Sequence, residues 1–581
     1  MIQITVINAL YTRLIKSDIK NETVMNNIVL IISVSLIIVF TVLAGESNGK
    51  SHAASLIPQI DASKRITPSA NGSINEEAPI PAQCYTKTEG INNPCYTCHQ
   101  TYSTPKDNKY RTNLRNDGAN QGLYNFSDEG ETNHWNNLFV DRRQWMKQIT
   151  NEQIAKYVDQ DNYSDLAQKL KNRQWQGFIP DLKNYHLAKA AFDKKGIAKD
   201  GSGWVAFNYK PFPGTFWPTN GATDDVLIRL PEEFRQLNGQ YNESIYLINL
   251  SLVEMAIKDL KEIDIFTVNE IDIDTDINKD GKITSTVEAL KTRSFFVGDA
   301  KNIRVARQQY PVKTEIMHSV RYVGVDENDQ IYTPKRMKEL RYMTKTKLLS
   351  DGAIDTAYRR ERKEKLDEQL PHYTKVKDRG FNNKFGWLIQ GYIEDYDGEL
   401  RPQSYEETSY CMGCHSAIGT TIDQTFAFPR KVTGKAGWGY LNLKGMEDAP
   451  SLNQKQGEIL QYLQVNGGGN EFRENLEMLK KWYKSDGSVD KEKVKRADVY
   501  QLITPSKQRA YDLNKAYSQI VRMQSFIHGR DVNITSAINA HKTVDESVEP
   551  LKDEHRLNGW DIRLNWTKSN NNITNITEQI K

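Results

Sequence analysis

The chain has few cysteines, 5 in 581 residues. Four of them fall in two short motifs described below, so only one thiol is left over. A framework of disulfides needs several paired thiols and is therefore excluded as the organising principle of this chain. A protein of this length must instead be held together by hydrophobic cores, and two or three domains are expected.

An excess of one charge sign is also missing. The chain carries 77 basic and 74 acidic residues, a net charge of +3. Nucleic-acid binding usually needs a concentrated basic field, so nucleic acid is excluded as a partner. Hydrophobic residues make up 38% and charged residues 26% of the chain, as in soluble globular proteins.

Long apolar runs are rare as well, and the clear one lies near the N-terminus. Residues 28–44 read IVLIISVSLIIVFTVLA without a charge, and Arg13, Lys16 and Lys20 precede them. This pattern predicts a cleaved export signal or an uncleaved membrane anchor, with the body of the protein periplasmic or otherwise exported. No cysteine closely follows the run, which argues against a lipid anchor.

Two pentapeptides carry most of the functional information: Cys95-Tyr96-Thr97-Cys98-His99 and Cys411-Met412-Gly413-Cys414-His415. Both read C-x-x-C-H, the attachment motif of c-type haem. The spacing lets both sulfurs reach one porphyrin edge while the following histidine turns under the iron. Cys95, Cys98, Cys411 and Cys414 are thus predicted to bind two haem c groups covalently, with His99 and His415 as axial iron ligands. Zinc-binding or redox-active cysteines are the alternatives.

The fifth thiol, Cys84, lies shortly before the first motif. It is predicted to be a packed or free cysteine, with an intermolecular bridge or a thiolate ligand to haem iron as alternatives.

The second axial ligand decides whether a haem iron is closed or open to small molecules. His318 leads into an apolar strand and is the first candidate for a distal ligand. His134 lies close in sequence to the first motif and is the second. For each of them, an ordinary hydrogen-bonding or surface histidine is the alternative.

Residues 276–283 read DINKDGKI and match the first eight positions of an EF-hand calcium loop. The candidate ligands are Asp276, Asn278, Asp280 and the carbonyl of Lys282. The twelfth position holds Val287 where the motif has an acid, and Glu288 follows one residue later. Calcium or a plain Asp/Asn-rich turn both fit this pattern.

The expected fold is mixed α+β with much irregular structure, a multi-lobed c-type cytochrome with two haem sites. Its predicted parts are an export segment (1–44), a linker (45–80), a first haem region with the calcium loop (81–330), a mostly helical second haem region (331–568) and a flexible tail (569–581). Residues 319–325 and 385–393 are predicted as strands, and residues 243–261 as a helix. The highly charged residues 334–370 are predicted as a solvated helix or helical hairpin.

The chain resembles exported bacterial di-haem c-type cytochromes of several hundred residues. The resemblance rests on both C-x-x-C-H motifs and on residues 212–221, 276–281 and 318–322. It implies a redox protein outside the cytoplasm and no particular substrate.

The predicted function is therefore single-electron transfer through two covalent haems, with redox proteins as partners. Membrane association would come only from residues 28–44, if they are not cleaved. Two alternatives remain open: a di-haem oxidoreductase of peroxidase or thiosulfate-oxidising type with an open or thiolate-ligated haem, and a haem subunit of a larger electron-transfer complex.

Overall fold

The computed structural model describes residues 56–66, 78–102, 116–214, 216–367, 369, 373–467 and 475–566. The chain divides into two units between residues 56 and 57, and the account below concerns the described residues of the second. The predicted export segment and the predicted C-terminal tail lie outside the described residues. Among the described residues, no helix is long and apolar enough to cross a membrane.

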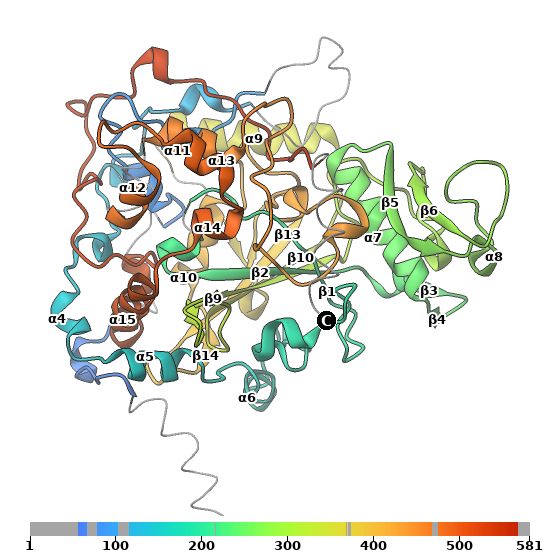
Figure 1. Ribbon diagram of the computed structural model, residues 1–581, viewed down its shortest axis with the longest axis horizontal. Helices are drawn as coiled ribbons and strands as arrows, with labels where there is room; N and C mark the ends of the chain where they lie inside the picture. The colour runs from blue at the N-terminus through green and yellow to red at the C-terminus, as the bar shows by residue number, and fades with distance from the viewer. Residues whose placement is uncertain are drawn as a thin grey trace, which may run out of the picture. The chain divides into compact units, whose positions relative to one another are not determined.

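An antiparallel sheet occupies the middle of the second unit (Figure 1). Eight strands are assigned to it within the described residues, and β14 joins at the edge of β13. In spatial order the others are β1 (Val205–Ala206), β2 (Thr223–Arg229), β7 (Glu315–Arg321), β10 (Met337–Lys345), β13 (Trp387–Glu394), β12 (Phe381–Asn382) and β11 (Thr374–Lys375), and β14 spans Leu400–Pro402.

The sheet separates two layers because successive side chains of a strand point to opposite faces. Leu227, Met317 and Leu340 face one core together with Trp204 and Tyr185. The alternate positions of the same three strands are Val226, His318 and Arg341, which lie in register and line a cavity on the other face.

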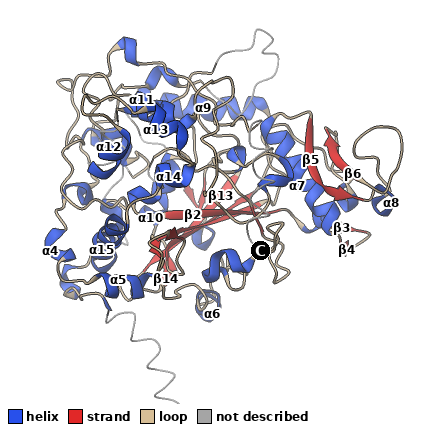
Figure 2. Cartoon of the chain, viewed as in Figure 1, coloured by secondary structure: helices blue, strands red, loops and turns tan. Residues whose placement is uncertain are grey.

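Helices and loops surround this sheet (Figure 2). Their bounds are α4 (Arg143–Met146), α5 (Asn151–Val158), α6 (Leu166–Asn172), α9 (Asp351–Leu366), α10 (Tyr405–Ser409), α11 (Glu458–Asn466), α12 (Leu476–Trp482), α13 (Lys491–Arg496), α14 (Val499–Ile503) and α15 (Lys507–Met523). Side-chain caps start several of them: Thr150 begins α5 and Ser404 begins α10, each in a capping box.

A smaller lobe extends from one side of the sheet (Figure 1). It contains β3 (Gln236–Leu237), β4 (Gln240–Tyr241), α7 (Glu243–Lys258), β5 (Glu262–Val268), α8 (Glu270–Ile273) and β6 (Val287–Lys291). Nearly all of α7 is buried, as expected for a helix that is apolar around most of its circumference.

The mixed α+β class is confirmed, and strands are found close to residues 319–325 and 385–393, as predicted. The prediction of a helix or helical hairpin over 334–370 is wrong in its first part. Residues 337–345 form β10, a buried central strand, and only α9 is helical. The charges that suggested a solvated helix are paired inside the protein: Glu339 binds Arg341, and Lys345 binds Asp423.

The hairpin of β8 (Gly324–Val325) and β9 (Ile331–Tyr332) follows β7. The boundary predicted at residue 330 falls inside this hairpin. The central sheet therefore takes strands from both predicted haem regions.

Candidate functional site

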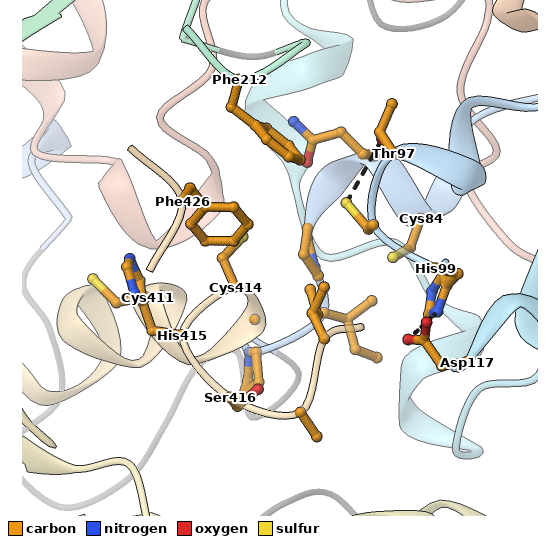
Figure 3. A pocket seen from close by; sticks show the side chains of 18 of the residues that line it. Cys84, Thr97, His99, Asp117, Phe212, Cys411, Cys414, His415, Ser416 and Phe426 are labelled. Atoms are coloured by element: carbon orange, nitrogen blue, oxygen red, sulfur yellow. Dashed lines mark hydrogen bonds and ion pairs between the residues drawn. The ribbon is translucent and has the colours of Figure 1, made fainter. Parts of the chain in front are cut away.

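Both C-x-x-C-H motifs line one cavity of about 750 Å³. The cysteines and histidines of both motifs contribute to its wall, together with Cys84, Asp117, His318 and Arg341. Figure 3 shows His99 beside Asp117 on one side of the cavity and His415 with Cys411 on the other. Two motifs far apart in sequence are thus brought to a single site.

The two motifs share one local conformation. In the first, the amides of Cys98 and His99 both donate to the carbonyl of Cys95, at 3.1 and 2.8 Å. In the second, the amides of Cys414 and His415 donate in the same way to the carbonyl of Cys411, at 3.2 and 2.9 Å. The backbone therefore makes the same turn between the first cysteine and the histidine in both motifs.

Neighbouring residues hold the first turn in place. The side chain of Asn93 accepts from the amide of Tyr96 at 3.1 Å, and Pro94 begins the short 3-10 helix Pro94–Thr97. In the second motif, α10 runs directly into the 3-10 helix Tyr410–Gly413. Both turns therefore follow from local sequence signals that fix where a helical segment starts.

Each motif histidine has an acceptor at Nδ1. His415 Nδ1 lies 2.7 Å from the carbonyl oxygen of Gln424, and a carbonyl can only accept, so Nδ1 carries the proton. His99 Nδ1 lies 3.1 Å from Oδ2 of Asp117. With the proton at Nδ1, Nε2 keeps its lone pair, which is the form of imidazole that ligates a metal.

Burial lowers the pKa of His415 to about 4, and its ring packs edge-on against Phe426 at 5.6 Å. Burial also raises the pKa of the Cys411 thiol, so this cysteine is a neutral thiol at neutral pH.

The sheet forms the cavity floor near the second motif. His318 on β7 and Arg341 on β10 are in register and both line the cavity. Arg341 is held by Glu339, whose oxygens lie 2.9 Å from Nε and 3.1 Å from Nη2. Nδ1 of His318 is buried and has no hydrogen-bond partner. Burial, and then Arg341, lower the pKa of His318 well below its usual range, so the ring is neutral.

The structure does not bring His134 to this site. His134 is not among the described residues that line the cavity, and its Nε2 lies 3.3 Å from the carbonyl of Glu129. Cys84 does line the cavity beside the first motif (Figure 3).

The predicted calcium loop lies in the small lobe, between α8 and β6. Its side chains bond to the loop's own backbone: Asp276 accepts from the amide of Gly281 at 3.0 Å, and Asp280 accepts from the amide of Lys282 at 2.8 Å. Oδ1 of Asp276 is buried without a hydrogen-bond partner. Calcium binding by Asp276, Asn278, Asp280 and Lys282 stays a prediction.

Sequence reasoning missed Asp117, Gln424 and Arg341 as parts of the site. Asp117 and Gln424 lie in polar segments after the motifs, where sequence alone does not single out one carboxylate or one carbonyl. No local signal marks Arg341, because the apolar residues of 337–345 (Met337, Leu340, Tyr342 and Met343) do not alternate strictly with polar ones.

Comparisons with known proteins give a family and no activity. A family model described as "-like lipoprotein" matches residues 67–498. The chain is also similar to an "Uncharacterized lipoprotein" of Aquifex aeolicus (strain VF5), with 32% identity over 521 residues, covering 79% of this chain and 86% of that protein. No solved structure matches.

These matches correct the resemblance to di-haem c-type cytochromes, because the matching family is one of lipoproteins. In the part of the chain that the structure describes, no group of three or more His, Cys, Asp or Glu side chains is arranged to hold a metal ion. The assignment as an electron-transferring cytochrome is therefore wrong, together with its oxidoreductase and complex-subunit alternatives. Neither comparison bears on what the two motifs bind.

Proposed function

Because the chain belongs to this lipoprotein family, which brings no assigned activity, we propose a function from the cavity itself: the protein is an exported binding protein that attaches haem c at each motif. The observation that carries the proposal is the pair of identical motif turns on one cavity, each with a histidine whose Nδ1 faces an acceptor.

The residues present fit the group. A porphyrin supplies four nitrogens to its iron, so the protein needs only one or two further ligands and no cluster of three. His99 and His415 would each supply one nitrogen, Nε2. Nδ1 of His318, which is buried without a hydrogen-bond partner, would be a further nitrogen ligand on the cavity floor, and His318 interacts electrostatically with His415 of the second motif. Aromatic side chains such as Phe212 and Phe426, which pack at 4.9 Å, provide the apolar wall that a porphyrin needs.

The covalent step would need only the cysteine thiols and the two vinyl groups of the haem. Each thiol would add its S–H bond across one vinyl C=C, with sulfur bonding to one carbon and hydrogen to the other. Nothing would leave, and no external oxidant or reductant would be consumed. When bound, the haem would supply a redox-capable iron, while the chain would position the thiols, orient the imidazoles of His99 and His415 and shield the ring from water.

The export segment supports the same proposal. Bacterial c-type haem is attached outside the cytoplasmic membrane, and lipoprotein family members are exported proteins anchored to a membrane. The first cysteine of this chain is Cys84, well beyond the apolar run 28–44. We therefore assign export, and anchoring where it occurs, to residues 28–44 rather than to a lipid-modified cysteine.

Expression with a bacterial c-type haem maturation system tests the proposal. We expect a pyridine haemochrome assay to give two covalent haems per chain, and mass spectrometry to find the mass of haem on the peptides containing residues 95–99 and 411–415. The paired changes Cys95→Ser with Cys98→Ser, and Cys411→Ser with Cys414→Ser, should each remove one haem. Cys84→Ser is the matched control and should retain both. A correctly folded chain without covalent haem would overturn the proposal.

A further inference from the structure

The two motif histidines have acceptors of different charge. His99 faces a carboxylate, Asp117, whereas His415 faces a neutral backbone carbonyl, that of Gln424. A carboxylate pulls the Nδ1 proton more strongly than a carbonyl does and raises the basicity of the ring as a metal ligand. The two imidazoles therefore differ as donors although the two motif turns are alike.

Asp117 is fixed from both sides of the cavity. Its Oδ1 accepts from the amide of Gln100 at 2.7 Å, directly after the first motif. Its Oδ2, which faces His99, also accepts from the amide of Gly419 at 3.2 Å, in the loop that follows the second motif. Tyr102 adds another link, because its hydroxyl donates to the carbonyl of Gly419 at 3.1 Å.

The loop 416–425 therefore contacts the partners of both histidines. Gly419 binds Asp117, and Gln424, near the other end of the loop, accepts from His415. Asp423 anchors the loop to the rest of the protein by accepting from Lys345 on β10 and from the amide of Tyr310. A loop held at these points keeps the carboxylate at the first motif and the carbonyl at the second.

A charged side chain of the sheet reinforces the difference between the two motif histidines. Arg341 lines the cavity on the side of the second motif, in register with His318. A nearby cation disfavours positive charge on a metal centre, and a nearby carboxylate favours it. Arg341, which the sheet places near the second motif, and Asp117, which the loop holds at the first, therefore both increase the difference between the two sites.

Resting on the proposed function, we infer that Asp117 is a positioning residue that makes the two sites unequal: iron held through His99 is a stronger-donor, harder-to-reduce centre than iron held through His415. Ligand basicity and nearby charge are two of the means by which a protein sets the potential of haem iron. The effect requires Asp117 to be a carboxylate and to keep its contact with His99.

The test compares reduction potentials in chains that carry one haem each. In the background lacking Cys411 and Cys414, Asp117→Asn should shift the equilibrium toward the reduced form about tenfold, which is about 59 mV for one electron. Asp117→Glu, which keeps the carboxylate, should restore most of the wild-type value. In the matched background lacking Cys95 and Cys98, Asp117→Asn should leave the remaining haem unchanged. Circular dichroism checks that every variant is folded.

Failure of the role inferred for Asp117 and failure of the proposed haem attachment give different experimental results. Haem that is attached but shows an unchanged potential in Asp117→Asn, or an equal shift in both backgrounds, overturns the role of Asp117 and leaves haem binding intact. A first site that is easier to reduce than the second in the wild-type chain also overturns it. Folded chains without haem in either background overturn the proposed function and this inference together.

Discussion

Glu254 is a fully buried carboxylate between two buried lysines. Its oxygens lie 2.7 Å from Nζ of Lys258 and 2.7 Å from Nζ of Lys431. Burial lowers the pKa of both lysines, that of Lys431 to about 8, and Glu254 opposes this shift. Glu254→Gln removes the only charge that compensates them in this contact, and we expect it to lower the free energy of unfolding by about 3–5 kcal/mol. Urea denaturation at pH 7 measures the change.

An exposed ion pair that includes a residue of the same lobe, Glu288 on β6, is the matched control for Glu254. Glu288 and Lys435 lie 2.8 Å apart at the surface, so Glu288→Gln should have little effect. The deficit of Glu254→Gln should also shrink as pH rises toward 8. Glu254 raises the pKa of both lysines, so without it the buried lysines lose their protons at a lower pH than in the wild type, and the folded variant is then relieved of the uncompensated charge. Equal losses in the two variants would contradict this account.

Asp224 on β2 lines the cavity, and its carboxyl accepts from the hydroxyl of Tyr209 at 3.1 Å. Burial raises the pKa of Asp224 to about 7. The folded protein thus keeps a proton that the unfolded chain releases near pH 4, so stability should fall as pH rises from 4 to 7. We expect a contribution of about 2–4 kcal/mol, absent in Asp224→Asn. Urea denaturation at pH 4.5 and 7 tests it, and equal pH slopes in the two proteins would refute it.

At the residue scale, the sequence predicts which motif residues line the cavity better than it predicts their hydrogen-bond partners. The motif cysteines, the motif histidines and His318 do meet at one cavity. Asp117 and Gln424 were missed because a hydrogen bond from a histidine to a particular acceptor depends on how two loops meet. His134 was proposed for its nearness in sequence to the first motif, and the fold directs it elsewhere.

Among the elements, β10 shows why charge patterns mislead. Four of its nine residues are Lys338, Glu339, Arg341 and Lys345, which suggested a solvated helix. Each has a partner inside the fold; Lys338, for example, donates to the carbonyl of Gly221 and lies over the ring of Tyr517. Such partners come from distant segments, so a local pattern cannot report them. Elements with mainly apolar sequences, such as α7 and β13, were predicted close to the bounds that the structure shows.

The side chain of Asn514 attaches helix α15 to Val323, the residue directly before β8. The buried side chain of Asn514 bonds to both backbone groups of Val323. Its Oδ1 accepts from the backbone N–H of Val323 at 3.1 Å, and its Nδ2 donates to the carbonyl oxygen of Val323 at 2.7 Å. Asn514→Ala leaves both backbone groups without this partner, and we expect a loss of about 1–3 kcal/mol in unfolding free energy. Gln508→Ala, on the exposed first turn of α15, is the control and should cost much less. Thermal unfolding of both variants tests the prediction, and a neutral Asn514→Ala would disprove it.

Across the whole molecule, the segment 530–566 returns to cover the first motif. Bridges pair Thr86 with Ala540 and Thr132 with Thr543, and Gln121 donates to the carbonyl of Asn558 at 2.8 Å. The sequence predicted two haem regions in succession along the chain. It could not predict this return, because nothing in residues 530–566 marks them as the partner of a segment more than 400 residues earlier.

Trp560 is the contact through which this segment reaches the first motif. Its indole N–H donates to the carbonyl of Tyr96 at 3.0 Å, and its backbone amide donates to the side chain of Gln100 at 3.0 Å. The side chain is 4% exposed. Trp560→Ala should therefore cost about 3–5 kcal/mol of stability and loosen the turn that carries Cys95 and Cys98.

The effect of Trp560→Ala on haem attachment should be greatest at the first motif, because both hydrogen bonds of Trp560 go to residues 96 and 100, whereas its other ring contacts are with Phe212 and Arg430. We expect mass spectrometry to show reduced haem on the peptide containing residues 95–99 and full occupancy on the peptide containing 411–415. Trp560→Phe keeps an aromatic ring and loses only the indole N–H, so it should fall between wild type and Trp560→Ala. Equal loss at both peptides would instead mean that the substitution unfolds the protein as a whole and that the C-terminal segment has no particular role at the first motif.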